Sequence, residues 1–250
     1  MLQNVMYRRF AFSQTELLRT ETEDRATARG VCSALTYDWI KLQLAGLKVH
    51  YSEQIKNLLY HAMSHQRAYA SRGREGLVAE RVAQLEQRLP PLSRKKDLEQ
   101  FQDQDTADYI GMLAQQDGLR TAVKDVDDLL DEFAEIPVGQ AKFEGAQEQA
   151  ILEREQQIMI ALTSMAWYLS FPTRGSRHAV GLHFHRNGAT FFDANYGVFY
   201  NKTNWLSLIW LFSNHLPLTY GVKPANILCI AMFGSPRDAA AIKEVSRALG

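Results

Sequence analysis

The sequence changes its character near Thr163. Before it, long Gln-, Glu-, Lys- and Arg-rich stretches carry apolar residues three or four positions apart, which is typical of amphipathic helices. After it, short aromatic or β-branched segments alternate with turn residues, which is typical of strands. The expected strands are SMAWYLSF, RHAVGLHFH, ATFFDANYGVFY and NILCIAMF. Helices followed by an antiparallel sheet predict the α+β class.

The chain is predicted to hold a leader and one domain. Residues 1–29 include a polar stretch without sustained periodicity, which predicts an exposed, flexible leader. Residues 30–250 are expected to form a single domain, with a helical region over residues 52–160. Proline and glycine predict breaks between helices inside that region rather than domain boundaries. These breaks are Pro90-Pro91, Asp117-Gly118 and Ile136–Gly139.

Composition and hydropathy exclude several classes of protein. The 250 residues carry 28 basic and 28 acidic side chains, interspersed, so a nucleic-acid partner is not expected. The apolar stretches are shorter than the roughly 20 residues of a membrane-spanning helix, and the N-terminus lacks a classical export signal. An aromatic helix is expected from Asn204 to Leu216, and the absence of Lys and Arg within it favours a core helix over a membrane-surface helix.

Cys32 is a candidate nucleophile because of its position. Val31, Leu35, Trp39 and Leu42 recur at helical spacing, so Cys32 lies in the first turn of a helix. The positive end of the helix dipole favours a thiolate there. The structural alternative is a small buried apolar side chain. Cys229, within a continuous apolar strand, fits that alternative, and two cysteines are too few for a disulfide scaffold.

His178 and Asp193 are candidate partners of Cys32. If residues 177–185 form a strand, His178 shares a face with apolar side chains and needs a hydrogen-bond partner. The returning strand offers Asp193, which an even-length hairpin loop places on the same face. Cysteine followed by histidine after roughly 130–150 residues is the order of papain-like proteases. The separation here is 146 residues.

Three short motifs resemble a particular family. They are Gly30-Val31-Cys32, His178-Ala179-Val180-Gly181-Leu182 and Asp193-Ala194-Asn195-Tyr196-Gly197-Val198-Phe199. Their order and spacing are similar to those of the YopT-like effector cysteine proteases, peptidase family C58. The resemblance implies a papain-like fold, with the helical N-terminal and middle part packed on a C-terminal antiparallel sheet, and a Cys32, His178, Asp193 triad without a cofactor. It also implies a bacterial protein that is secreted without a classical signal peptide and acts in the host cytoplasm on a protein substrate, such as a Rho-type GTPase or a kinase.

One part of the family site has no obvious match. The family completes its oxyanion hole with an asparagine side chain a few residues before the cysteine. Residues 15–31 contain neither Asn nor Gln, and Thr27 is the best-placed substitute by position. Losing a good oxyanion donor costs roughly 100-fold or more in turnover. Either Thr27 or a distant residue supplies the donor, or the chain is a slow enzyme or an inactive one.

Other readings stay open at this stage. The same triad supports acyl transfer or deamidation, and a helical interaction module with a buried Cys32 needs no catalysis. His183 and His185 share one strand face, but no third metal ligand is expected there, so no metal site is predicted. His61 and His65 share a helix face but lack the glutamate of a zinc peptidase, and are interpreted as surface residues.

The turn between the two motif strands decides their register. A two-residue turn at Asn187-Gly188 pairs residue 182 with 193 and leaves His178 about 13 Å away along the strand. A four-residue loop over 184–187 sets His178 directly opposite Asp193. Since the triad requires contact between these two side chains, the longer loop is expected.

Overall fold

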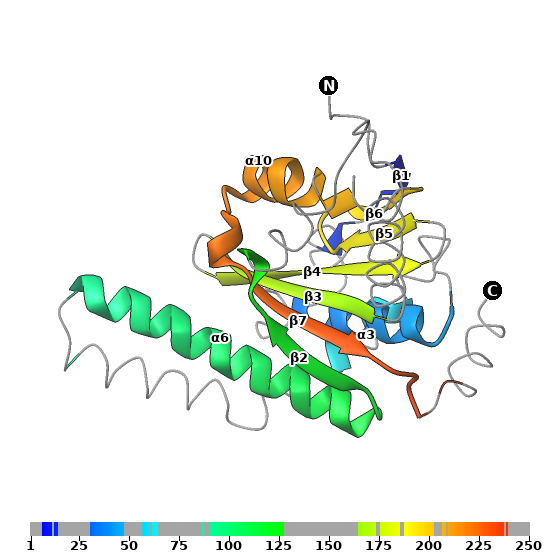
Figure 1. Ribbon diagram of the computed structural model, residues 1–250, viewed down its shortest axis with the longest axis horizontal. Helices are drawn as coiled ribbons and strands as arrows, with labels where there is room; N and C mark the ends of the chain where they lie inside the picture. Colours follow the sequence, from blue (N-terminus) through cyan, green and yellow to red (C-terminus); the bar gives the residue numbers. More distant parts are fainter. Residues whose placement is uncertain are drawn as a thin grey trace, which may run out of the picture.

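A computed structural model shows how these segments are arranged. It describes residues 7–11, 13–14, 31–47, 57–60, 62–64, 87, 91–127, 165–173, 176–185, 188–202, 207–208, 210–237 and 239. These residues form one seven-stranded antiparallel sheet in the order β1-β6-β5-β4-β3-β7-β2, with β4 at its centre (Figure 1). The α+β class predicted from the sequence is confirmed.

The elements follow the chain in a simple order. They are β1 Tyr7–Phe10, α3 Cys32–Leu44, α6 Pro91–Gln116, β2 Arg120–Lys124, β3 Met165–Thr173, β4 Ser176–His185, β5 Gly188–Asp193, β6 Gly197–Asn201, the π-helical turn η1 Leu211–His215, α10 Leu216–Tyr220, the 3₁₀ turn η2 Pro224–Asn226 and β7 Leu228–Phe233. Antiparallel neighbours that follow one another in sequence, β3 to β6, build the centre of the sheet.

Helix α3 packs closely on one face of the sheet. Trp39 of α3 stacks on Phe192 of β5, with 5.4 Å between ring centroids. Beneath the same indole lies Gly181 of β4, where a Cβ atom would come within 2.7 Å of the Trp39 ring. The absence of a side chain at Gly181 therefore lets the helix approach the central strand. The start of α3 then lies beside the first residues of β4.

The opposite face is covered by the segment that precedes β7. Leu208, Leu211, Phe212 and Leu216 are buried against β3, β4 and β5, so the core interpretation of this aromatic segment is confirmed. The described residues of the expected helix, 207–208 and 210–216, are helical, with the π-helical turn η1 continuing directly into the short α10. Within the described residues, no helix is long and apolar enough to cross a membrane.

The helical middle region is confirmed in part. Helix α6 begins at Pro91, a residue suited to the first helical position because it lacks an N–H, and ends at Gln116. The break predicted at Asp117-Gly118 is present, with Gly118 at φ +78°. Residues 120–124 contradict the helical prediction, because they form β2, paired with β7 at the sheet edge (Figure 1). The pairing with β7 stabilises the strand conformation of this short, partly exposed segment.

The N-terminal prediction is wrong for one stretch. Residues 7–10 lie within the expected leader, but they form β1 and pair with β6. Residues 15–30 lie outside the described part of the chain. The boundaries of the expected domain stay a prediction.

The predicted register of β4 and β5 is wrong by two residues. His185 pairs with Gly188, so the two residues between the strands are 186 and 187 and the loop is short. Val180, not His178, is opposite Asp193. The two-residue Asn187-Gly188 turn would have placed residue 182 there, so the observed register lies between the two alternatives. His178 is two residues from Val180, the partner of Asp193, and side chains alternate along a strand, so His178 and Asp193 share a face.

Candidate active site

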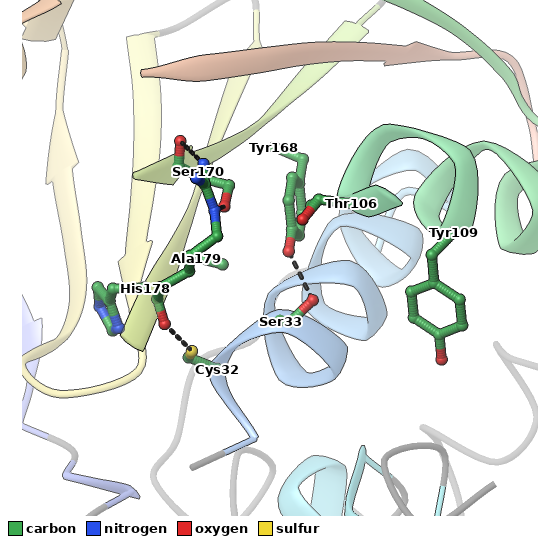
Figure 2. A pocket seen from close by; sticks show the side chains of 9 residues that line it. Cys32, Ser33, Thr106, Tyr109, Tyr168, Ser170, His178 and Ala179 are labelled. Atoms are coloured by element: carbon green, nitrogen blue, oxygen red, sulfur yellow. Dashed lines mark hydrogen bonds between the residues drawn. The ribbon is translucent and has the colours of Figure 1, made fainter. Parts of the chain in front are cut away.

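Cys32 is the first residue of α3, and the start of this helix is held against β3 and β4. The Thr36 hydroxyl donates to the carbonyl oxygen of Ala179 at 3.1 Å, and the Ser33 and Tyr168 hydroxyls are 2.6 Å apart. The Cys32 Sγ atom lies 3.8 Å from the carbonyl oxygen of Arg177, directly before His178 (Figure 2). These contacts fix the thiol beside the strand that carries the histidine.

The surroundings of Cys32 favour its thiolate. Burial on its own would raise the pKa of this thiol, but the hydrogen bond and the charge of His178 outweigh burial, so the pKa is lowered from its ordinary value. Backbone hydrogen bonds involving Ala179 and Ser33 act in the same direction. A lowered pKa in a partly accessible position is typical of reactive rather than structural cysteines.

His178 lies between Cys32 and Asp193. Its Nε2 atom is 3.0 Å from Asp193 Oδ1, and the side chain interacts with the Cys32 thiol as well. Burial would lower the pKa of this imidazole, but its hydrogen bonds to Asp193 and Cys32 raise it to about 10. A raised histidine pKa beside a lowered cysteine pKa favours a thiolate–imidazolium pair at neutral pH.

The contact between His178 and Asp193 is diagonal across the two strands. Because Val180 is opposite Asp193, His178 is two residues along β4 on the same face. Diagonal neighbours of this kind are within reach of long and aromatic side chains. The strand register therefore permits the hydrogen bond although the expected direct pairing is absent.

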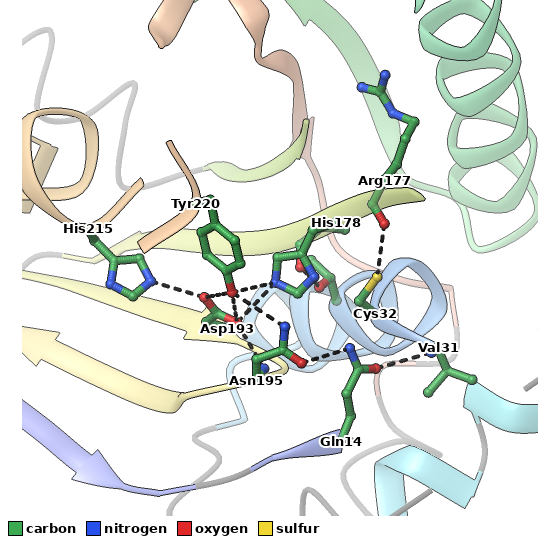
Figure 3. A network of polar contacts seen from close by, with 11 residues as sticks. Gln14, Val31, Cys32, Arg177, His178, Asp193, Asn195, His215 and Tyr220 are labelled. Atoms are coloured by element: carbon green, nitrogen blue, oxygen red, sulfur yellow. Dashed lines mark hydrogen bonds and ion pairs between the residues drawn. The ribbon is translucent and has the colours of Figure 1, made fainter. Parts of the chain in front are cut away.

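Asp193 is fully buried and accepts several hydrogen bonds. Its Oδ1 atom accepts from the backbone N–H of Asn195 at 2.9 Å, in addition to His178. Its Oδ2 atom is 3.0 Å from Nε2 of His215, and the Tyr220 hydroxyl donates to both oxygens, at 3.0 and 2.8 Å (Figure 3). Burial would raise the pKa of this carboxyl, but the two histidines lower it, so Asp193 is an anion.

Gln14 reaches the start of α3 from the N-terminal part of the chain. Its backbone N–H donates to the carbonyl oxygen of Ala194 at 2.8 Å, which ties it to the turn after β5. Its Oε1 atom accepts from the backbone N–H of Val31 at 3.1 Å, and its Nε2 atom donates to Asn195 Oδ1 at 3.1 Å (Figure 3). A buried amide therefore lies next to the residue that precedes Cys32.

A pocket of about 150 Å³ opens beside the thiol, between α3, α6, β3 and β4 (Figure 2). It is lined by Cys32, Ser33, Thr106, Tyr109, Tyr168, Ser170, Arg177, His178 and Ala179. Arg177 forms an ion pair with Asp103 of α6 and donates to the hydroxyl and the carbonyl oxygen of Ser170. The ion pair joins β4 to α6, so the wall of the pocket is held in place.

Sequence reasoning found some of these residues and missed others. Cys32, His178 and Asp193 come together, whereas the predicted Thr27 lies outside the described residues. Gln14 was not predicted because it lies one position before residues 15–31, where the amide was expected. His215 and Tyr220 were missed because no spacing in the sequence relates them to Asp193.

His183 and His185 make their contacts outside this network. His183 and His185 have ring centroids 6.0 Å apart, and His185 Nε2 lies 3.2 Å from the Thr190 hydroxyl. Within the described ranges, no cluster of three or more His, Cys, Asp or Glu side chains is arranged to hold a metal ion. His61 and His65 lie outside the described residues.

Comparison with known families agrees with the motifs. A family model for peptidase C58, described as Yersinia/Haemophilus virulence surface antigen, matches residues 9–210. The chain belongs to peptidase family C58. The match includes Cys32, His178 and Asp193, together with Gln14. Family C58 is a family of cysteine protease effectors.

The other comparisons add little. The solved structure titled "Crystal Structure of Pseudomonas Avirulence Protein AvrPphB" is similar over 84% of this chain and 93% of its own, with 14% sequence identity and a TM-score of 0.39. A similarity of that degree supports no functional argument. None of the curated proteins matches this C58 member significantly.

Proposed function

We propose that this C58 member is a cysteine endopeptidase with a Cys32, His178, Asp193 triad. The Cys32 thiolate attacks the carbonyl carbon of the scissile peptide bond, and His178 donates a proton to the leaving amine as that bond breaks. The resulting thioester is hydrolysed by a water molecule from which His178 removes a proton. Asp193 holds the imidazole in the required orientation throughout.

One observation carries this proposal: His178 is hydrogen-bonded to Asp193 on one side and interacts with the Cys32 thiol on the other. Nε2 of His178 is hydrogen-bonded to Asp193, which leaves Nδ1 to exchange a proton with the Cys32 sulfur. The neighbouring pocket gives a substrate access to the same sulfur atom. A merely structural cysteine needs neither the polar partners nor the pocket.

We assign the hydrogen bonds that stabilise the oxyanion to the start of α3 and to Gln14. The first N–H groups of a helix have no acceptor within the helix, so the Cys32 N–H is available to a developing oxyanion. The Gln14 amide lies beside Val31. Among the described residues, only Asn195 accepts a hydrogen bond from its NH₂ group, so the second amide hydrogen is available to an oxyanion. Gln14 thus fits the donor role for which Thr27 was the sequence candidate.

The biological setting follows from the family resemblance. We assign the chain as a secreted bacterial effector that acts in the host cytoplasm. Its expected partner is a host protein substrate, with GTPases and kinases as the first classes to test. The pocket beside Cys32 is large enough for a benzene-sized group, so one medium-sized substrate side chain fits there.

Incubation with a host-cell lysate tests hydrolysis against the alternatives. Wild-type protein is expected to create new protein N-termini that the Cys32→Ala variant does not create, measured by N-terminal labelling and mass spectrometry. Amine adducts or Gln-to-Glu conversions in place of new N-termini would identify acyl transfer or deamidation instead. Identical proteomes with both proteins, together with an unreactive Cys32, would favour the interaction module.

A further inference from the structure

Asp193 has a second side that the triad does not use. Its Oδ1 atom faces His178, but Oδ2 points the other way, toward Nε2 of His215 at 3.0 Å. Tyr220 lies between these two directions, with its hydroxyl 3.0 Å from Oδ1 and 2.8 Å from Oδ2. The same hydroxyl is 3.0 Å from Nε2 of His178 (Figure 3). Three ionisable side chains thus meet around one buried carboxylate.

An irregular backbone directs His215 at this carboxylate. His215 is the last residue of the π-helical turn η1, and a π-helical turn inserts an extra residue and rotates the side chains that follow. The imidazole stacks on Trp210, with centroids 4.8 Å apart and planes inclined by 22°. Edges and faces of Phe191 and Phe199 enclose it further. Within this aromatic enclosure, Asp193 is the polar partner that His215 contacts.

Tyr220 approaches from the end of α10. Gly221 follows it in the left-handed conformation, at φ +68°, which ends the helix directly after the tyrosine. The phenol ring lies beside the His178 ring, with 4.9 Å between centroids, and beside Phe171, at 5.2 Å. Tyr220 therefore contacts both members of the histidine–aspartate pair, whereas His215 contacts only the aspartate.

We propose that His215 and Tyr220 are positioning residues that hold the Asp193 carboxylate in the plane it needs to orient His178. This inference rests on the proposed peptidase function. A carboxylate that is held through one oxygen alone can rotate about its Cβ–Cγ bond, and rotation breaks the bond to Nε2 of His178. Hydrogen bonds to the second oxygen prevent that rotation, so the imidazole stays aligned with Cys32.

Three variants separate positioning from core packing. His215→Phe keeps an aromatic ring in the enclosure but removes the donor, and His215→Gln restores an N–H near the position of Nε2. Tyr220→Phe removes only the hydroxyl. His183→Phe is the matched control, because it removes a half-buried sheet histidine that lies outside this network.

The readouts are peptide hydrolysis and the pH dependence of Cys32 alkylation by iodoacetamide. We expect kcat to fall roughly 10- to 100-fold in His215→Phe and Tyr220→Phe, with KM nearly unchanged, because each loses a hydrogen bond to a charged group. The alkylation midpoint is expected to rise, since a misaligned Asp193 stabilises the imidazolium less. His215→Gln should recover much of the loss, and His183→Phe should match the wild type.

Unchanged kcat and an unchanged alkylation midpoint in both Phe variants would overturn the inference. A second result would also overturn it: His215→Gln stays as slow as His215→Phe while Tyr220→Phe is fully active. If His215→Phe does not fold, Tyr220→Phe decides alone, because it keeps the ring and its packing. A wild-type protein whose Cys32 reacts no faster than an ordinary thiol would instead refute the peptidase function. The two failures are therefore distinguishable.

Discussion

One cysteine of this chain begins a helix packed on the sheet and the other lies within the sheet, and their surroundings shift the two thiol pKa values in opposite directions. Cys32 starts α3 beside an imidazole and a pocket, and its pKa is lowered. Cys229 lies in the middle of β7, fully buried, and burial raises the pKa of its thiol well above the ordinary range, although Lys124 acts in the other direction. The comparison teaches that partners, and not burial alone, decide whether a thiol is reactive.

Backbone geometry reinforces the difference. Cys229 pairs with Leu169 of β3 and Lys124 of β2, so its strand is hydrogen-bonded on both sides. Cys32 lies at a helix start, where backbone N–H groups have no partner within the helix and favour negative charge. A thiolate, and later an oxyanion, is stabilised at the helix start and not in the strand.

Exchanging each cysteine for alanine gives the largest expected contrast. Cys32→Ala should abolish hydrolysis, with a loss on the order of 10⁶-fold in kcat where the assay can follow it, because it removes the nucleophile. Its melting temperature should be unchanged or higher, since functional sites commonly carry a stability cost. Steady-state kinetics and thermal denaturation measure both effects. Wild-type turnover in Cys32→Ala would contradict the account.

Removing the orienting carboxylate should give the next largest effect. Asp193→Ala is expected to lower kcat roughly 10³- to 10⁴-fold, because the imidazole loses its orientation and the stabilisation of its charged form. The reactivity of Cys32 should also fall toward that of an ordinary thiol. Alkylation rates at neutral pH measure this. A variant that keeps fast alkylation and turnover would remove Asp193 from the triad.

The Gln14 amide should have a smaller effect. Gln14→Ala is expected to lower kcat roughly 100-fold, as for the loss of an oxyanion donor. Gln14→Glu keeps an acceptor for the Val31 N–H but lacks the amide donor, so it should remain slow. Gln104→Ala, an exposed position on α6, is the matched control and should be fully active. Full activity in Gln14→Glu would show that the donor lies elsewhere.

Cys229 should affect only stability. Cys229→Ala removes a buried sulfur atom and leaves a small cavity, so the free energy of unfolding should fall by roughly 1–2 kcal/mol. Turnover per folded molecule should equal that of the wild type. Chemical denaturation and kinetics on the same preparation test both expectations. A loss of activity in Cys229→Ala without a loss of stability would mean that the two cysteines are not as different as their surroundings indicate.

The sequence predicted the parts of the site that local patterns encode. The helical spacing after Val31 placed Cys32 at a helix start, and strand alternation placed His178 and Asp193 on one face. The exact register was wrong, because the direct pairing of these two residues is not required for their contact. Diagonal contact depends on side-chain reach, which a turn-length argument ignores.

The rest of the site depends on tertiary packing. Gln14 reaches Val31 only because its segment is held at the turn after β5, through Ala194. His215 reaches Asp193 only because a π-helical turn rotates it inward. Likewise β1 and β2 are strands because neighbouring strands pair with them, and their own sequences are weak signals.

The most direct test of the central claim is the pH dependence of alkylation at each cysteine, measured by mass spectrometry on the folded wild-type protein. We predict that Cys32 reacts with an alkylation midpoint below the roughly 8.5 of an ordinary thiol, because its pKa is lowered by His178. Cys229 should stay unmodified until the protein unfolds. A Cys32 midpoint at or above 8.5, or equal protection of both cysteines, would contradict the assignment of Cys32 as the nucleophile.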